Sequence, residues 1–446
     1  MRFTDLHRNV KIRIYVLFAF GTVQATTMPF MAIYFAQNLG EALTGILLTM
    51  SIVASMFSGM LGGFYADRFG RKKLMVGSEA VFLLAYLVMA FANSPWLHSP
   101  SLTFAMFLFT NVCWGIYGPA DEAMLIDVTT SESRPFVYSI FYWVWNLTMA
   151  VGASIGAVLF EHYRFFLFTA MSIVLLGTLL TTIFKIEETF HPNHVIHPGA
   201  QGDVETNARR RFSFKRLLPN GILKNYASVM KDTTFVKYIF AGMLVMAVEF
   251  QLSNYIGIHF SKDIVHQSLI HIKNFHIWID GVKMLGFLQT ENTIIVVLLA
   301  SIAVRIVNRY PDRRVLFFSI LLNTVGYSFM IVVNAPWVLM GLMVIATIGE
   351  ISSVPIRQTY LGDIAPSAAR SSYVAANGLT FDGSQIMASL GVMLGAVVSP
   401  WMMAALSLAS GIGGFLLFYS IVPAVHRRRK QNDEVSVQGD AGSVSL

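Results

Sequence analysis

The sequence predicts an all-α membrane protein in which twelve transmembrane helices form two six-helix bundles related by pseudo-symmetry. Three observations support this prediction. The 446 residues are 55% hydrophobic and only 13% charged, with a mean hydropathy of +0.60, whereas soluble domains carry about 25% charged residues. The apolar runs are continuous over about 20 residues, as a membrane helix needs. They do not alternate as barrel strands do, so a transmembrane barrel and a soluble enzyme are excluded.

Apolar runs bounded by charged residues, Pro or Gly give the predicted spans in chain order. In the first half they cover residues 14–36, 43–65, 74–92, 101–126, 136–160 and 165–184. In the second half they cover residues 235–259, 292–307, 315–333, 337–360, 371–395 and 401–424. We expect an N-terminal bundle over residues 1–184, a cytoplasmic linker over 185–234, a C-terminal bundle over 235–425 and a disordered tail over 426–446. Pro, Gly, Asn and charged residues identify the linker.

Basic residues predict how these spans are oriented. Lys and Arg gather at the two termini, after the second span and in the linker, and short loops that carry them stay in the cytoplasm. The first span follows four basic residues and lacks a small-residue cleavage site, so it is a retained span rather than a signal peptide. We therefore expect a multi-pass protein of the plasma membrane with both termini in the cytoplasm. The opposite loop, 261–291, is long, and we expect part of it to form an interfacial helix.

An internal repeat favours two bundles of the same design. Three residue types recur with identical spacing around the ends of the fourth and tenth spans. They are Pro119, Asp127 and Arg134 in the first half, and Pro355, Asp363 and Arg370 in the second. Since six spans return a chain to its starting side, the two halves would be parallel repeats of the kind found in secondary transporters. Chance is the alternative explanation, because three matched residues at one offset are not rare in a long chain.

The loop between the second and third spans carries the most specific motif. Its sequence GGFYADRFGRKK fits the pattern G-x-x-x-D-R-x-G-R-K at Gly63, Asp67, Arg68, Gly70, Arg71 and Lys72. Glycines at this spacing allow close helix approach and a tight turn, and the aspartate can accept charge-assisted hydrogen bonds. The motif resembles the signature loop of the major facilitator superfamily, and we expect it to latch the cytoplasmic gate. A simple basic loop explains its Lys and Arg residues but neither Asp67 nor the glycines.

The chain further resembles the drug:proton antiporters of that superfamily, and specifically the lactococcal-type multidrug antiporters. The similar segments are TGILLTMSIVASMFSGMLGGFYADRFGRK, AMLIDVTTSESR, YWVWNLTMAVGASIGAVLF, EETF and GEISSVP. This resemblance implies the major facilitator fold, with the first, fourth, seventh and tenth spans around a central cavity. It implies roles in conformational coupling for Asp67 and Asp127, and in proton and substrate handling for Glu350. Phe141 and Ser253 stand where the relatives carry acids.

Three acids, Glu249, Glu350 and Asp382, lie deep inside predicted spans. Charged groups at such depth cost several kcal/mol, so an acid there has a functional reason by default. The resemblance puts Glu249 and Glu350 in the central cavity. We expect Glu350, Glu249, Asp382 and Asp127 to take part in proton coupling, since a carboxyl group that holds either a proton or a cation can exchange one for the other. The alternative is a structural carboxyl group, protonated and bonded to a neighbouring helix or paired with Arg357.

Two further sets of candidate residues follow from position and chemistry. The gate set comprises the six motif residues together with Arg134, Asp363 and Arg370, near the cytoplasmic span ends. The substrate-cavity set comprises polar and aromatic groups within apolar spans, namely Tyr34, Asn111, Trp114, Tyr117, Tyr142, Trp145, Asn146, Gln251, Asn254 and Tyr255. Aromatic faces suit lipophilic and cationic ligands. Ordinary packing is the alternative for about half of this set, because Tyr and Trp also anchor helices at membrane surfaces.

These features predict a secondary active transporter, namely a proton-coupled exporter of lipophilic or cationic compounds that works by alternating access. The alternative is a facilitator-type transporter of a sugar, peptide or lipid-linked substrate, and a membrane-embedded enzyme or sensor is a remote alternative. The sequence contains no GxxxxGK[ST] loop for ATP. No His lies deep in a span beside a nucleophile. We therefore expect no enzymatic activity and no cofactor, with the proton gradient as the energy source.

The expected partners are the lipid bilayer, a small lipophilic or cationic substrate and protons, and we expect a monomer. We expect no nucleic-acid partner, because the basic residues gather between spans. His191, His194 and His197 have a spacing that suits metal ligation but lie in the polar linker, so we expect no metal site. The single cysteine, Cys113, excludes an intrachain disulfide.

Overall fold

The computed structural model describes residues 6–130, 133–189, 229–265, 267–272, 275–307, 309–366 and 370–443. Most of the expected linker lies outside these ranges, and so do His191, His194 and His197. The side chains of Asp67, Arg134 and Arg370 also lie outside the described part of the structure, although their backbone positions fall within helices.

The first half of the chain forms six long helices, as predicted. They are α1 (Arg8–Leu39), α2 (Glu41–Phe69), α3 (Arg71–Ala92), α4 (Pro100–Asp127), α5 (Arg134–Leu159) and α6 (Arg164–Lys185). A short antiparallel hairpin, β1 (Asn93–Ser94) with β2 (Leu97–His98), joins α3 to α4. Two glycines make sharp junctions between helices. Gly40 and Gly70 have φ angles of 88° and 99°, a conformation that other residues rarely adopt.

The second half supplies six more membrane-crossing segments. The first of them is α8 (Thr233–Phe250), which continues through a π-helical turn η4 (Leu252–Ile256) into α9 (Gly257–Asp263). The others are α10 (Gly281–Val307), α11 (Asp312–Met330), α12 (Pro336–Ile364), α13 (Arg370–Gly395) and α14 (Pro400–Ser443). Asp232 begins α8 by accepting hydrogen bonds from the amides of Thr234 and Phe235, as an N-cap aspartate does.

The predicted interfacial helix within 261–291 is wrong. This segment forms an antiparallel hairpin, β3 (Gln267–Ile272) with β4 (Phe275–Ile279), and then the first turns of α10. Residues 267–279 alternate polar and apolar side chains over much of their length, which is the periodicity of a strand rather than of a helix. The eighth span therefore begins at Gly281 instead of residue 292, and Glu291 lies inside it.

The end of the chain also differs from expectation. The segment 426–446 was expected to be a disordered tail, but α14 continues as a helix to Ser443. No proline follows Pro423 in α14, so the backbone can keep its helical hydrogen bonds after the apolar run ends.

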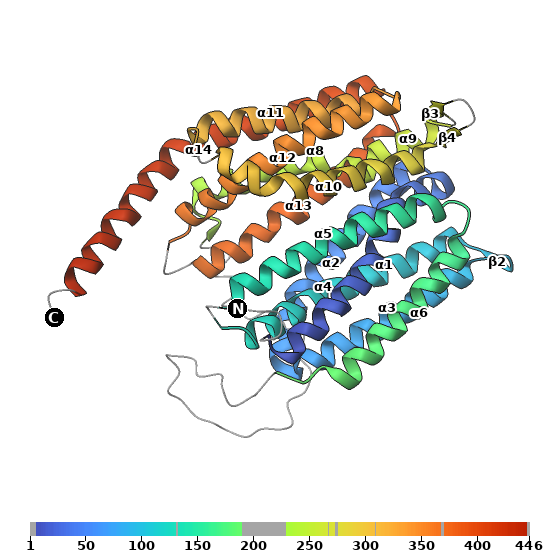
Figure 1. Ribbon diagram of the computed structural model, residues 1–446, viewed down its shortest axis with the longest axis horizontal. Coiled ribbons are helices and arrows are strands. Elements are labelled where there is room, and N and C mark those ends of the chain that lie inside the picture. Colours follow the sequence, from blue (N-terminus) through green and yellow to red (C-terminus); the bar gives the residue numbers. More distant parts are fainter. Residues whose placement is uncertain are drawn as a thin grey trace.

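The fold class predicted from the sequence is confirmed. Among the described residues, ten helical segments are long and apolar enough to cross a membrane, with α8, η4 and α9 counted as one segment. Figure 1 shows α11 and α13 running alongside them, which gives the twelve spans expected. Both ends of the chain lie at the left of Figure 1 and the two hairpins lie at the right. We call these two ends of the bundle the terminal face and the hairpin face.

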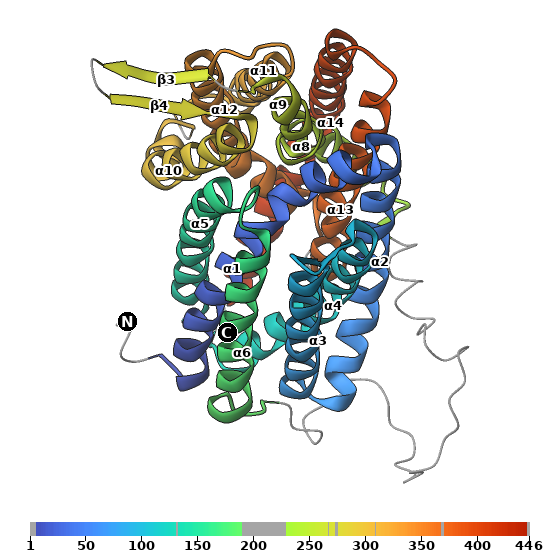
Figure 2. The same cartoon turned by 90° about the vertical axis from the view of Figure 1, so that its right-hand side faces the viewer.

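The two halves of the chain form two groups of helices. In Figure 2, α1 to α6 lie below and α8 to α14 lie above, and the groups meet where α2 packs against α13 and α5 packs against α10. Small residues allow these approaches. A Cβ atom at Gly45 of α2 would collide with the Met393 backbone of α13, and one at Gly286 of α10 would collide with Ala157 of α5.

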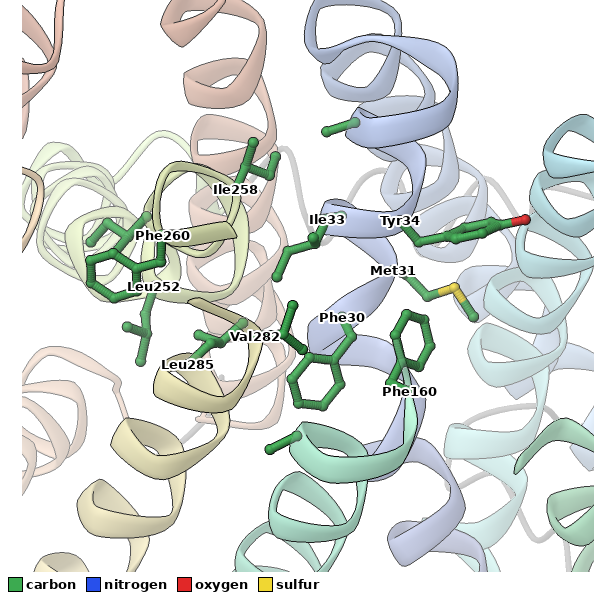
Figure 3. Packing of buried hydrophobic residues seen from close by; sticks show 14 of the residues in the cluster. Phe30, Met31, Ile33, Tyr34, Phe160, Leu252, Ile258, Phe260, Val282 and Leu285 are labelled. Atoms are coloured by element: carbon green, nitrogen blue, oxygen red, sulfur yellow. The ribbon is translucent and has the colours of Figure 1, made fainter. Parts of the chain in front are cut away.

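The described contacts between the halves gather towards the hairpin face. Figure 3 shows Phe30 and Ile33 of α1 beside Leu252 and Leu285 of the second half, all within one buried hydrophobic cluster. Lys262, at the end of α9, forms an ion pair with Glu41, at the start of α2. The halves are thus joined at the hairpin face by apolar packing and an ion pair.

Candidate functional site

Two acids of the second half share one electrostatic environment inside the membrane. Glu249 lies in the last turn of α8, and Glu350 lies near the middle of α12. The charge of Glu350 acts on Glu249, and the charge of Arg357 acts on both carboxyl groups. Two carboxylates that interact in this way disfavour each other's ionisation, so a proton or a cation at either one relieves their repulsion.

Asn292 of α10 fixes the position of the Glu350 side chain. Its Nδ2 atom donates to Glu350 Oε2 at 2.9 Å and to Thr347 Oγ1 at 3.0 Å. Thr347 is fully buried on α12, one turn before Glu350. The Glu350 carboxylate oxygen and the Thr347 hydroxyl oxygen therefore both accept from one amide nitrogen, in a part of the bilayer where polar groups are costly to bury alone.

The backbone beside Glu249 departs from regular α-helix. The π-helical turn η4 begins three residues after Glu249, and such turns occur frequently at functional sites. Gln289 of α10 donates to Ser253 Oγ of this turn at 2.9 Å. The turn is therefore hydrogen-bonded to α10, the helix whose Asn292 binds Glu350. A movement of α10 would act on both acids.

Glu291 is a further intramembrane acid that the sequence analysis missed. It precedes Asn292 on α10, is only partly exposed, and its Oε2 atom is hidden from solvent without a hydrogen-bond partner among the described residues. We had treated it as the end of a loop, because its charge interrupts the apolar run. The apolar residues 284–288 before it and 294–299 after it were the signal that could have identified one continuous span.

The other two predicted proton-coupling residues lie elsewhere. Asp382 is on α13, which packs against α2 and α8, and no hydrogen bond or ion pair joins it to Glu249 or Glu350 within the described residues. Asp127 is the last residue of α4, at the terminal face. The structure thus brings together two of the four acids.

The signature loop forms a compact ionic network at the terminal face. Arg71 Nε lies 2.9 Å from Asp127 Oδ2. Glu188, just after α6, accepts hydrogen bonds from the backbone amides of Arg71 and Lys72 at 3.0 and 3.2 Å. Gly70 makes room for this carboxylate, because a Cβ atom there would collide with it. Glu188 therefore caps the start of α3, where the helix dipole favours an anion, although we had singled out only the segment EETF that contains it.

Three other motif residues take no described part in this network. Arg68 is exposed, and its guanidinium lies 5.7 Å from the ring centre of Phe69. Gly63 is near Pro119 of α4 without close contact. The Asp67 side chain lies outside the described part of the structure, so its latch role stays a prediction.

A matching network in the second half joins Asp363, a predicted gate residue, to partners that the sequence analysis missed. Asp363, the counterpart of Asp127 in the repeat, accepts from Arg429 at 2.8 Å, and the same guanidinium lies 3.3 Å from Asp312. Both repeats thus end in an aspartate paired with an arginine. The arginine comes from the start of α3 in one half and from the extension of α14 in the other, so no fixed sequence spacing could reveal both pairs.

Asp232 and Arg428 form a second ion pair of this network. The two Arg428 nitrogens donate to the Asp232 carboxylate at 2.7 and 2.9 Å, and the Tyr373 hydroxyl donates to it at 2.9 Å. Burial alone would raise the pKa of Asp232, but the hydrogen bonds from Arg428 and Tyr373 and the charge of Arg428 outweigh it and lower the pKa.

A buried ion pair in the first half, Arg13 with Asp121, lies beside Phe141. Arg13 of α1 is 2% exposed, forms an ion pair with Asp121 of α4, and donates to the Asp121 carbonyl oxygen at 2.7 Å. Its guanidinium also lies 5.5 Å from the ring centre of Phe141. Phe141, which stands where the relatives carry an acid, therefore contributes a cation–π contact to an arginine already neutralised by Asp121.

The predicted substrate-cavity residues divide into three groups. Tyr34, Tyr117, Gln251 and Tyr255 are buried, Asn111, Trp114, Asn146 and Asn254 are partly buried, and Tyr142 and Trp145 are exposed. Within this set, Trp114 and Tyr117 stack on Phe20 with ring centres 5.8 and 5.6 Å away, and Trp145 lies 6.5 Å from Trp114. The structure thus gathers an aromatic cluster from α1, α4 and α5. Tyr34 packs in the same hydrophobic core as Phe20.

Comparisons with known proteins identify the family. The model of the Major Facilitator Superfamily matches residues 14–270 and 269–443. A Na(+), Li(+), K(+)/H(+) antiporter of Planococcus maritimus is 32% identical and covers 88% of this chain and 90% of its own. Multidrug resistance protein MdtH of Blochmanniella floridana is 23% identical over 89% and 92% of the two chains. A solved peptide transporter, POT, shares the fold with a TM-score of 0.69 at 14% identity, covering 96% and 97% of the two chains.

We predict that Glu188→Gln lowers the free energy of unfolding by about 1 kcal/mol, because the α3 amides lose a charged cap. Thermal unfolding of the purified protein, followed by intrinsic fluorescence, measures this change. Glu187→Gln is the matched control, since Glu187 is 66% exposed and pairs with Arg8 at the surface. The control is expected to change stability by less than about 0.5 kcal/mol. Equal effects of the two substitutions would contradict the capping role.

We predict that Asp232→Asn lowers the free energy of unfolding by about 1 kcal/mol near neutral pH. This value is at the upper end of what a partly exposed ion pair contributes to stability. Because the folded-state pKa of Asp232 is lowered, this stabilisation is fully present above the unfolded pKa of about 4 and is lost as pH falls through the folded value. Melting temperatures of the two proteins should therefore differ by a constant amount from about pH 5 to about pH 8 and converge at lower pH. If the difference in melting temperature became larger at low pH, the lowered pKa of Asp232 would be refuted.

Proposed function

Because the chain belongs to the Major Facilitator Superfamily and is a transporter rather than an enzyme, we propose that it is a proton-coupled antiporter that exports a monovalent cation by alternating access. The observation that carries the proposal is the pair of interacting carboxyl groups, Glu249 and Glu350, with Glu350 held by Asn292. The relative at 32% identity supports the cation, since its name specifies exchange of Na+, Li+ or K+ for H+.

The chemistry of the pair suits such an exchange. Carboxylate, amide and hydroxyl oxygens are the ligands that hard cations prefer, and Glu350, Asn292 and Thr347 supply all three types. A proton and a cation compete for the same carboxylate oxygens, so binding of one releases the other. When access to the pair alternates between the two membrane faces, this competition couples the two fluxes. The proton gradient is then the energy source, and neither a cofactor nor a partner subunit is required.

Electrostatics also suggests which side of the membrane each face meets. Arg71, Lys72, Arg428 and Arg429 lie at the terminal face, and basic residues favour the cytoplasmic side. We therefore place both termini in the cytoplasm of a cell whose plasma membrane holds the protein. In this orientation the apolar contacts and the ion pair at the hairpin face lie on the outer side of the membrane.

The test uses proteoliposomes that enclose a pH-sensitive dye. We predict that a Na+ or K+ pulse outside the liposomes drives the cation inward and protons outward in the wild type, so that the enclosed dye reports a rise in internal pH, and that Glu350→Gln reduces this signal to background because the pair loses its shared charge. Glu161→Gln, in the turn between α5 and α6 outside the pair, is the control and should leave the signal unchanged. Full cation-driven proton movement by Glu350→Gln would overturn the proposal.

Export of lipophilic organic cations is the second candidate. The observation that favours it is the aromatic cluster of Phe20, Trp114, Tyr117 and Trp145, because aromatic faces attract organic cations once these lose water. The MdtH relative, a multidrug resistance protein, supports it at 23% identity. Both candidates use the same acid pair and differ in the group that recognises the passenger.

Trp114→Ala separates the two candidates. If organic cations are passengers, we predict that this substitution lowers proton-coupled transport of a fluorescent cationic dye about tenfold, since a desolvated cation–π contact is worth about 1 to 2 kcal/mol. Na+-driven proton movement should stay within about twofold of the wild type. Dye transport that does not respond to Trp114→Ala, or that is absent in the wild type, would remove the second candidate.

A further inference from the structure

The second half contains a cavity apart from the acid pair. It has a volume of about 140 Å³ and is lined by residues of α8, α13 and α14 together with Ile331 at the end of α11. No residue of α10 or α12 lines it, so it is separate from the helices that carry Asn292 and Glu350. We call it the α8/α14 cavity.

One polar group in this cavity has an unfilled hydrogen-bonding capacity. Gln251 is only 9% exposed, and its Oε1 atom is hidden from solvent with no hydrogen-bond partner among the described residues. A buried amide oxygen without a partner costs free energy comparable to a lost hydrogen bond. Gly391 of α13 leaves room for this amide, because a Cβ atom at that position would collide with the Gln251 nitrogen.

The two serine hydroxyls of the cavity are already engaged. Ser407 accepts from Ser328 at 2.9 Å, and Ser410 donates to the Leu244 carbonyl oxygen at 2.9 Å. The Gln251 carbonyl oxygen is therefore the polar atom of the cavity that has no hydrogen-bond partner among the described residues. The remaining wall is apolar and includes two methionines, Met387 and Met403, whose flexible side chains adapt to varied ligands.

The cavity opens towards lipid. Leu394 of α13 and Leu406 of α14 line it and are 42% and 44% exposed, and α14 is among the helices that are long and apolar enough to cross a membrane. A ligand that enters between these two leucines comes from the bilayer and must be lipophilic. A volume near 150 Å³ holds one benzene ring in an apolar protein cavity, which sets the size of the ligand.

We propose that the α8/α14 cavity binds a small lipophilic molecule, about one aromatic ring in size, that enters from the bilayer and donates one hydrogen bond to the Gln251 carbonyl oxygen. Gln251 directly precedes the π-helical turn and lies two residues after Glu249. An occupant therefore braces α8 where its backbone departs from α-helix. The site does not depend on which passenger the transporter carries, so it goes beyond the proposed function and is tested without transport.

The test compares two probes of nearly equal shape, para-fluorophenol, which has a donor, and para-fluorotoluene, which has none. Fluorine NMR measures their binding to the full-length protein in lipid nanodiscs, with empty nanodiscs as the reference for partition into lipid. We expect both probes to bind and the phenol to bind about three- to tenfold more tightly, which is the net worth of one neutral hydrogen bond.

Two substitutions locate the binding. Gln251→Leu keeps the volume but removes the acceptor, so the preference for the phenol should disappear while both probes still bind. Gln385→Leu makes the same change on α13 outside the cavity lining and should keep the preference. Ala247→Phe fills the cavity from α8 and should abolish binding of both probes. Protein folding is checked for each variant by its thermal unfolding profile.

Three results would overturn the proposal. They are signals no larger than those of empty nanodiscs, a phenol preference that survives Gln251→Leu, and binding that survives Ala247→Phe in a folded protein. If Gln251→Leu fails to fold, Gly391→Ala serves in its place, because the added methyl group must displace the amide and should likewise remove the preference. Failure of cation transport in the acid-pair experiment would leave this result unaffected.

Discussion

The repulsion between the Glu249 and Glu350 carboxyl groups is the physical constraint on which the proposed antiport depends. In a medium of low dielectric constant, two nearby negative charges are costly, and each needs a proton, a cation or a hydrogen-bond donor. Asn292 supplies the donor to Glu350. In the antiport that we propose, the need for the remaining compensating charge makes a proton and a passenger exclude each other, so the electrostatic cost of the pair couples their movements.

The two halves carry different polar and aromatic groups although they repeat one architecture. The second half holds the interacting acids, whereas the first half holds the aromatic cluster and a buried pair, Arg13 with Asp121, that neutralises itself. At the terminal face each half forms an ion pair between an aspartate and an arginine, Asp127 with Arg71 and Asp363 with Arg429. Symmetry of the backbone is thus compatible with asymmetry of function, because helix packing fixes positions but not the residues that occupy them.

The sequence was most informative where a local pattern has one physical cause. Continuous apolar runs gave eleven of the spans near their observed places, because each helix must match the thickness of the bilayer. Glu350 stood out since charge at that depth is rare. The same reasoning failed at α10, where Glu291 interrupts the apolar run. It also failed within 261–291, where an interfacial helix is predicted for part of the segment and residues 267–279 form a hairpin instead.

The sequence by itself determined the number of spans, the membrane as solvent, the signature loop and the depth of Glu249 and Glu350 within their spans. Only the tertiary structure decided which polar groups meet. It brought Glu249 to Glu350, Glu188 to the start of α3, Arg429 to Asp363, and left Asp382 apart from the pair. The reason is that hydropathy records the environment of each residue along the chain, whereas contacts between helices depend on their rotation and tilt, which are set by packing between residues far apart in sequence.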